Sequence, residues 1–293
     1  MRYWFLTPLQ SVPLGSTMLG MSPIITQTRA RVVRAGDYFS ELWSRREFAW
    51  FLAMGNLKAR NASTALGLLW WVINPLLLGL VYFVVFGVIF ESGRDISYLL
   101  SGMFVFHFTS QAMTGGANSI LQNSKLLANI RFPRLILPIA NLLEATVGFL
   151  ASLLVLYAIA IPGGHVHLNL NFLLLAYIIP VHLLFNLGLG ALTARLAVPF
   201  RDINNIIPYI NRLWLYLSPI IWPIEFMDRL TEPLQQVMLI NPMFSIIGVY
   251  RAALLGDTLP PGLLLRSGGM ALAISALGMV AFMKYESRIV RHL

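Results

Sequence analysis

The sequence predicts an all-α polytopic membrane protein: six transmembrane helices, an N-terminal interfacial amphipathic helix and an external re-entrant helical hairpin. The 293 residues are 57% hydrophobic and only 11% charged, whereas soluble domains carry about 25% charged residues. Residues 66–90 contain no charge until the segment ends, and at ~37 Å they are long enough to cross a ~30 Å hydrocarbon core. Apolar segments of similar length recur along the rest of the chain.

Residues 1–36 are expected to form a poorly ordered cytoplasmic arm. Pro8 and Pro13 interrupt its apolar run, so it lacks the unbroken hydrophobic region of a signal peptide. Residues 37–60 are expected to form the interfacial helix, with Asp37 as its cap. The membrane domain is then expected to cover residues 61–293.

Aromatic and charged residues alternate in the interfacial helix. On a helical wheel, Tyr38, Trp43 and Trp50 share the apolar side, and Arg46 interrupts it. A long arginine side chain can extend to water from such a position, and mixed aromatics and arginine favour a helix lying on the membrane surface. An ordinary amphipathic helix packed on protein is the alternative.

The expected spans are separated by charged or turn-forming loops. Between the fifth and sixth spans lies 233–255, where Pro242 halfway and Arg251 near the end favour two short helices that enter the membrane without crossing it. The six spans cover residues 66–90, 96–120, 135–161, 172–199, 206–223 and 263–283.

The positive charges predict the orientation. Seventeen of the 21 Lys and Arg residues fall on the side that holds both termini and the second and fourth loops. The other side holds Arg94, Arg229, Arg251 and Arg266. Because basic loops stay in the cytoplasm, both termini are expected inside. The net charge of +9 is dispersed among apolar spans, which argues against a nucleic-acid partner.

Glu144 is the one acid expected deep in a span. Burying it charged and alone would cost at least ~2.5 kcal/mol, so it must be protonated, paired or facing water. Arg212 lies at a similar depth in the fifth span and is a candidate partner, with a hydroxyl group as the alternative. A structural contact, a gating role and proton coupling remain open as explanations.

The sequence contains no recognisable catalytic set. It lacks GxSxG and HExxH motifs, and it has no cysteine for disulfides or thiolate metal sites. His165 and His167 lie in a loop without nearby acids, so no metal site is expected. The chain also lacks a GxxxxGK[ST] loop for ATP phosphates. If ATP drives a transport step, another polypeptide must bind the ATP and Mg, and this chain needs no cofactor.

The loop 122–137 combines basic residues with an aromatic–proline pair. Pro133 disfavours helix in the residue before it, so the loop is expected to present a short helix at about 124–130 and then turn sharply. Such a helix, with an apolar tip and basic flanks, can dock in a cleft of a partner. The alternative is a basic cytoplasmic loop without a docking role.

Taken in order, several short motifs resemble the ABC-2 permease family, and within it the exporters of O-antigen, capsule, teichoic acid and galactan polysaccharides. The resemblance covers residues 37–293; residues 61–63, Asn-Ala-Ser, depart from it, because the family often has an aromatic and further basic residues there. The motifs are Lys58-Ala-Arg60, Leu66-Gly67, Trp70, Pro75, Ile130-Arg131-Phe132-Pro133-Arg134, Pro199-Phe200-Arg201-Asp202, Asn241-Pro242 and Arg251.

The resemblance implies a homodimeric permease in the bacterial cytoplasmic membrane, joined to two separate ABC ATPase subunits, that exports a lipid-linked polysaccharide. The loop 122–137 would then be the coupling helix, and the helix carrying Tyr38, Trp43, Arg46 and Trp50 would touch the same ATPase. The coupling residues would be Lys125, Asn129, Arg131, Phe132, Pro133 and Arg134.

The first and fifth spans would line the path of the glycan. A sugar chain presents flat apolar faces, which favours aromatic side chains along its path, and a carrier diphosphate would be attracted to basic groups. The channel candidates are Tyr82, Phe83, Phe86, Tyr209, Trp214 and Tyr216, and the carrier-phosphate candidates are Lys58, Arg60, Arg201 and Arg212. The alternatives are an exporter of drugs or simple lipids, a proton-driven carrier, or a membrane enzyme acting on lipid-linked sugars.

Overall fold

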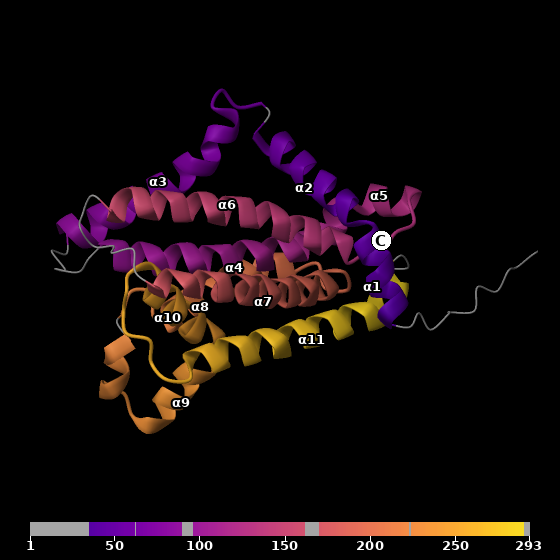
Figure 1. Cartoon of the computed structure of the whole chain (residues 1–293). Helices are drawn as coiled ribbons and strands as arrows, with labels where there is room; N and C mark the ends of the chain where they lie inside the picture. The colour runs from indigo at the N-terminus through magenta and orange to yellow at the C-terminus, as the bar shows by residue number, and fades with distance from the viewer. Residues whose placement is uncertain (1–34, 62, 90–95, 162–169, 223, 290–293) are drawn as a thin grey trace, which may run out of the picture.

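Four long helices run side by side through the protein (Figure 1). The computed structural model describes residues 35–61, 63–89, 96–161, 170–222 and 224–289, so most of the predicted N-terminal arm lies outside the described residues. All regular structure in the described part is helical. The four long helices are α4 (Ile96–Gln122), α6 (Ile136–Ala160), α7 (Leu174–Ala197) and α11 (Leu263–Ile289).

Three helical segments in the described residues are long and apolar enough to cross a membrane. They are Ile136–Ala160, Leu170–Ala197 and Leu263–Glu286, and the second includes a 3-10 turn before α7. The predicted third, fourth and sixth spans therefore correspond to membrane-length helices. Helix α4 matches the predicted second span and contains 27 residues, but polar residues such as Ser97, Ser101 and Thr109 are buried along it.

The predicted first span 66–90 is not one regular α-helix. It begins with a 3-10 turn at Gly67–Leu69, continues as α3 (Trp70–Tyr82) and ends as a π-helix at Phe83–Ile89. Gly67 has φ +48°, a left-handed conformation that favours glycine. The chain therefore turns sharply just before α3, and α2 and α3 form two sides of a wedge over α6 (Figure 1).

The predicted fifth span 206–223 is shorter than expected. Helix α8 (Ile203–Leu217) has 15 residues, or ~22 Å, and it ends because Ser218 is extended with ψ 149°. Pro219 follows directly, and proline disfavours helix in the residue before it. Helix α8 alone is thus shorter than the hydrocarbon core of a bilayer.

The predicted interfacial helix is divided into α1 (Ala35–Ser44) and α2 (Arg46–Asn61). Ser44 Oγ donates a hydrogen bond to the Glu41 carbonyl at 2.8 Å, and Arg46 Nη1 donates to the Trp43 carbonyl at 3.2 Å. These side chains satisfy carbonyl groups at the end of α1. The helix expected over 37–60 is therefore interrupted at Arg45, and the buried Tyr38 and Ala49 lie one on each side of the interruption.

The segment between the predicted fifth and sixth spans forms two short helices, α9 (Glu232–Ile240) and α10 (Pro242–Leu254), bent by 77°. A 3-10 turn at Ile224–Arg229 precedes them. The predicted break at Pro242 is confirmed. Asn241 fixes this corner: its Oδ1 accepts from Met243 N at 3.0 Å and from Trp214 Nε1 at 2.8 Å, while its Nδ2 donates to the Leu217 carbonyl at 3.1 Å.

Glycine allows the long helices to pack at very short distance. A methyl group on Gly278 of α11 would lie 2.8 Å from Gly188 Cα of α7 and closer still to its carbonyl oxygen. A methyl group on Gly116 of α4 would lie 2.6 Å from Gly190 Cα of α7. Real Cβ atoms do not approach backbone this closely, so both crossings require glycine.

Polar groups in the interior connect the helices. Thr109 Oγ1 of α4 and His182 Nε2 of α7 lie 2.7 Å apart, both fully buried. Arg251 of α10 is also fully buried and donates from Nη2 to the carbonyls of Tyr98 and Ile220 at 3.2 Å each. Its guanidinium carbon lies 3.4 Å from the centre of the Tyr98 ring. These contacts fix α10 against α4 and the chain that follows α8.

Candidate coupling surface and polar pocket

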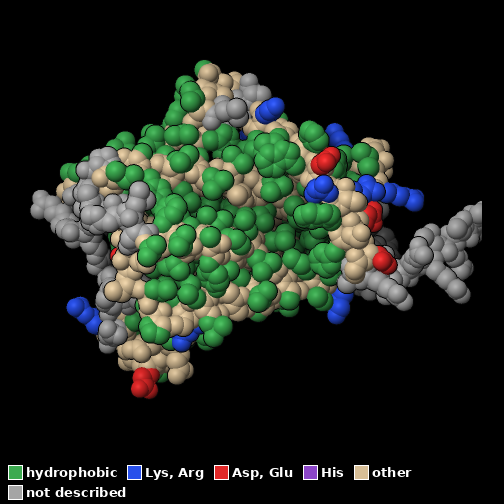
Figure 2. Space-filling model, in the orientation of Figure 1, with side chains coloured by type: hydrophobic (Ala, Val, Ile, Leu, Met, Phe, Trp, Pro, Cys, Tyr) green, Lys and Arg blue, Asp and Glu red, His purple; other side chains and the backbone are tan. Residues whose placement is uncertain are grey.

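One end of the molecule gathers three segments that are distant in sequence. Helices α1 and α5 (Ser124–Asn129) and the C-terminal end of α11 lie together there (Figure 1). Figure 2 shows charged side chains concentrated at this end and at the opposite end, with an apolar band between them. This distribution is the one expected for a helical protein that crosses a bilayer.

Helix α5 is the short helix predicted for the loop between the second and third spans. It ends at Asn129, one residue before the predicted end. Lys125, Asn129, Ile130 and Arg131 are exposed and form the outward surface of this loop, which we call the α5 surface. A basic surface with one apolar residue is suited to contact a protein partner.

The aromatic–proline pair of this loop faces inward. Phe132 and Pro133 are buried, and the Phe132 ring packs edge-on against Phe48 of α2 at 5.2 Å between ring centres. Phe132 and Pro133, predicted as coupling residues, therefore anchor the loop to α2 instead of forming its exposed surface. The exposed apolar residue is instead Ile130.

The C-terminal end of α11 holds the loop from the other side. Arg134 donates from its backbone nitrogen to Glu286 Oε1 at 2.7 Å, and its guanidinium contacts the Glu286 carbonyl. Tyr38 of α1 lies beside them: burial and the neighbouring Glu286 charge raise the pKa of its hydroxyl above the usual range. Tyr38 therefore stays neutral at physiological pH.

Sequence reasoning missed Glu286. The available signal was that it is the one acid in the basic segment 284–293. An acid with several cations nearby in sequence could pair with any of them. The contact of Glu286 with a loop 152 residues away could therefore not be inferred from that pattern.

The aromatic residues predicted for the interface helix divide between two environments. Tyr38 is buried, while Trp43 is 71% exposed and Trp50 is 50% exposed. The guanidinium carbon of Arg46 lies 5.3 Å from the centre of the Trp43 ring. An exposed tryptophan paired with arginine is typical of the boundary between lipid headgroups and acyl chains.

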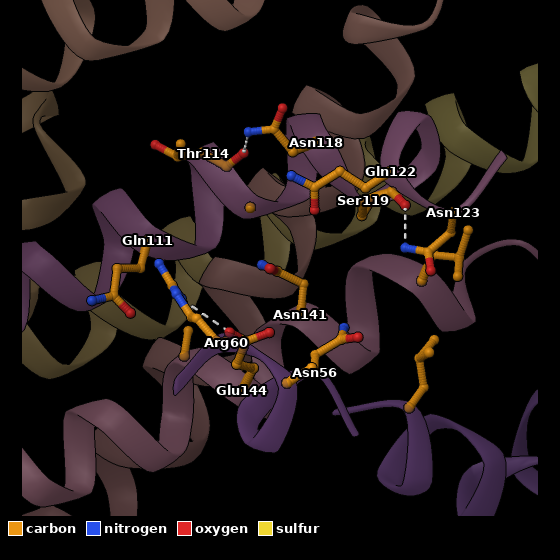
Figure 3. Close-up of a pocket in the computed structure, with 15 residues that line it drawn as sticks. Asn56, Arg60, Gln111, Thr114, Asn118, Ser119, Gln122, Asn123, Asn141 and Glu144 are labelled. Carbon is orange, nitrogen blue, oxygen red and sulfur yellow. Dashed lines mark hydrogen bonds and ion pairs between the residues drawn. The ribbon is translucent and has the colours of Figure 1, made fainter. Parts of the chain in front are cut away.

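A polar pocket of about 490 Å³ opens between α2, α4 and α6. Most of its lining side chains are polar, and six of them are amides, drawn in Figure 3. So many polar groups in a membrane domain mark a functional site. The amide residues are Asn56, Gln111, Asn118, Gln122, Asn123 and Asn141.

Glu144 lies in this pocket, and its partner is Arg60 rather than Arg212. Arg60 Nη1 and Glu144 Oε1 are 3.0 Å apart, with 66% of the Arg60 side chain and 12% of the Glu144 side chain exposed. The predicted pairing with Arg212 is wrong because α2 folds back onto α6. Equal depth along two spans does not specify which helices are neighbours.

A second cavity of about 420 Å³ adjoins the first. Arg60 and Gln111 line both cavities, and Trp71, Asn74 and His107 line the second one only. Gln111 Nε2 and His107 Nε2 lie 2.7 Å apart. The two cavities thus share Arg60: polar side chains line most of the first cavity, and Trp71 lines the second.

The remaining predicted phosphate ligands are accessible. Lys58, Arg201 and Arg212 are exposed, and none forms an ion pair within the part of the chain that the structure describes. Arg60 is exposed as well, but its guanidinium is engaged by Glu144. No acidic residue in the described part of the chain joins these four cations through shared ion pairs.

The predicted channel aromatics also separate. Tyr209, Tyr216 and Phe83 are exposed, at 71%, 60% and 48%, and Tyr82 is half-buried. Trp214 packs inward, edge-on to Phe106 at 5.9 Å, and bonds to Asn241, so it joins α8 to the hairpin corner. The side chain of Phe86 lies outside the described residues.

Comparison with known proteins decides the family. The model of the ABC-2 type transporter family matches residues 48–255. The chain belongs to this family. The match includes α3 to α10 and with them the α5 surface and both cavities. Within the ABC-2 family the chain is a transport component.

Its relatives include permeases of two polysaccharide systems. The chain is 28% identical over 223 residues to the O-antigen export system permease protein RfbA of Myxococcus xanthus, covering 75% of this chain and 85% of the relative. It is 25% identical over 207 residues to the protein of the same name from Klebsiella pneumoniae, covering 70% and 78%. It is 26% identical over 220 residues to the capsule polysaccharide export inner-membrane protein CtrC of Neisseria meningitidis serogroup A, covering 71% and 78%.

Proposed function

We propose that this ABC-2 permease exports a lipid-linked polysaccharide across the bacterial cytoplasmic membrane, driven by ATP hydrolysis in a separate ATPase. The observation that carries this proposal is the α5 surface, a basic surface that is anchored to α2 and α11 and therefore able to transmit a force. The relatives named for O-antigen and capsule export support the cargo class.

The proposed topology has six crossings with both termini in the cytoplasm. In it α8 and the chain that follows complete the fifth crossing, and the hairpin α9–α10 enters from the external side without crossing. The bend of 77° between α9 and α10 and the buried Arg251 support the hairpin. Both contacts of the Arg251 Nη2 atom are with backbone carbonyls of this chain, which keeps the charge away from lipid.

The proposed assembly is a homodimer with two ABC ATPases, which bind ATP and Mg. One face of α8 packs on α4 through Ile207 and Asn211, and the opposite face, with Tyr209 and Tyr216, is exposed. In the dimer this face, with Phe83, would form an aromatic path for sugar rings. Lys58, Arg201 and Arg212 would attract the carrier diphosphate, and Trp43 and Trp50 would contact membrane lipids and the ATPase.

The coupling role is tested by reversing charge on the α5 surface. Lys125→Glu combined with Arg131→Glu is expected to abolish co-purification of the ATPase subunit and surface display of the glycan, because close charge contacts at an interface contribute ~1.5–7 kcal/mol. Arg229→Glu, at the other end of the protein, is the matched control and should leave both intact. Retained ATPase binding in the double variant would refute the assignment.

The same experiment separates the proposal from export of drugs or simple lipids. Both kinds of exporter need the ATPase, but only a polysaccharide exporter leaves the glycan inside the cell when coupling fails. Normal glycan display after loss of ATPase binding would favour the other cargo.

A further inference from the structure

Three amide side chains in the polar pocket have no hydrogen-bond partner among the described residues. Asn56 of α2, Gln122 of α4 and Asn141 of α6 line the cavity and form no hydrogen bond with another described residue; only the bonds of other lining residues are drawn in Figure 3. By contrast, Asn118 and Asn123 donate to the carbonyls one turn earlier on α4. Three unpartnered amides on three different helices leave donors and acceptors for a ligand.

The close packing around Asn141 indicates that its position is specified. A methyl group on Gly115 of α4 would overlap the Asn141 amide, so glycine leaves the room that this amide occupies. Both residues line the pocket. The α4–α6 contact therefore has room for the Asn141 amide at the wall of the cavity.

The charge in the pocket favours a neutral ligand over a phosphate. Its one cation, Arg60, is already paired with Glu144 at 3.0 Å, and no other Lys or Arg lines the pocket. Amides both donate and accept hydrogen bonds, as hydroxyl groups do, whereas a phosphate at neutral pH mainly accepts and would meet the Glu144 carboxylate. A polyhydroxylated ligand matches this set of groups.

The adjoining cavity supplies the second element of sugar recognition. Trp71 lines it next to Arg60 and Gln111, and an indole ring can cover the apolar face of a sugar. The volumes of about 490 and 420 Å³ fall within the usual range of ~300–1,000 Å³ for small-ligand sites.

We propose that this pocket binds a sugar residue of the lipid-linked glycan within a single protomer. The hydroxyl groups contact Asn56, Gln122 and Asn141, and the Arg60–Glu144 pair keeps the site electrically neutral. This inference rests on the proposed function and deepens it: the pocket recognises the sugar, whereas the exposed cations elsewhere recognise the carrier phosphate.

Thiol labelling in cells tests the site, because the chain has no cysteine. Asn141→Cys and Asn56→Cys variants are each expressed together with an inactive form of the ATPase partner, so that glycan accumulates inside the cell. The cells are then labelled with N-ethylmaleimide. The control is Glu47→Cys on the same helix as Asn56, exposed at a polar position and outside both cavities. Each variant is compared in a glycan-producing strain and in one blocked at the first sugar transfer, which retains the polyprenyl phosphate.

The glycan should slow labelling at positions 141 and 56 by about threefold or more, because labelling follows the unoccupied fraction of the site. It should leave labelling at position 47 unchanged. Equal labelling in both strains, from a water-filled pocket or a phosphate ligand, would overturn the sugar site. If deletion of the chain causes glycan to accumulate inside the cell, the export function is supported even when labelling is equal in both strains. If glycan reaches the surface without the chain, the export function itself is wrong and the sugar site with it.

Discussion

The crossing of α7 and α11 predicts a large difference between two glycine-to-alanine substitutions on the same helix. In Gly278→Ala the new methyl group would lie 2.8 Å from Gly188 Cα, about 1 Å inside the optimal carbon–carbon separation. The obstacle is backbone, so relief requires moving a whole helix. Overpacking of this kind lowers the free energy of unfolding by ~1–3 kcal/mol. The higher helix propensity of alanine offsets at most ~1 kcal/mol of this loss.

Gly269→Ala is the matched control, since no atom lies within 4 Å of the position of its new methyl group. Thermal unfolding of the detergent-solubilised complex, followed by loss of its monodisperse chromatography peak, measures the difference. With a melting shift of ~2–4 °C per kcal/mol for a protein approaching this size, Gly278→Ala should melt several degrees below Gly269→Ala. Equal melting temperatures would refute the close crossing.

Three further predictions concern polar contacts. Arg60→Gln should destabilise more than Glu144→Gln, since it leaves a carboxylate that is 12% exposed without its cation, and thermal unfolding of both variants and of the double variant measures this. Glu286→Ala should release the α5 loop, since hydrogen bonds to a charged group contribute ~1.5–3 kcal/mol, and so reduce glycan-dependent ATPase activity severalfold. Lys284→Ala is the control and should leave this activity unchanged. Thr109→Val should lower stability by ~1–3 kcal/mol by leaving His182 Nε2 buried without its partner, and Thr109→Ser should not.

Each of these has a contradicting result. Equal losses in the two Arg60–Glu144 single variants would mean that the pair is solvated. ATPase activity that is unchanged in Glu286→Ala would mean that the end of α11 does not position the loop. Equal stability of the Thr109 variants would show that His182 finds another partner.

The sequence predicts local breaks well where one residue type determines them. Pro133 places the end of α5 to within one residue, and Pro242 places the corner of the hairpin. At Pro242 the backbone restriction acts on the adjacent Asn241, so the corner is readable without tertiary information, whereas α5 ends four residues before Pro133. The long apolar helices α6 and α7 are equally readable, because their composition excludes other environments.

Contacts between distant segments could not be predicted in the same way. Glu144 pairs with Arg60, and Arg134 with Glu286, because α2 and α11 happen to lie beside α6 and the α5 loop. The break at position 45 depends on two side chains that take up carbonyl groups, and other side chains of the same kinds elsewhere in the chain do not break a helix.

The two glycine crossings on α7 have a mechanical consequence. Gly188 of α7 contacts α11, and Gly190 of α7 contacts α4. The helices α4, α7 and α11 are therefore held together at neighbouring points, and none can slide without the others. Any alternation between inward and outward states must then come from parts that escape this lock: the wedge of α2 and α3, the slender α8, and the corner at Asn241. The centre of the permease would stay fixed during transport, and the peripheral helices would carry out the conformational change.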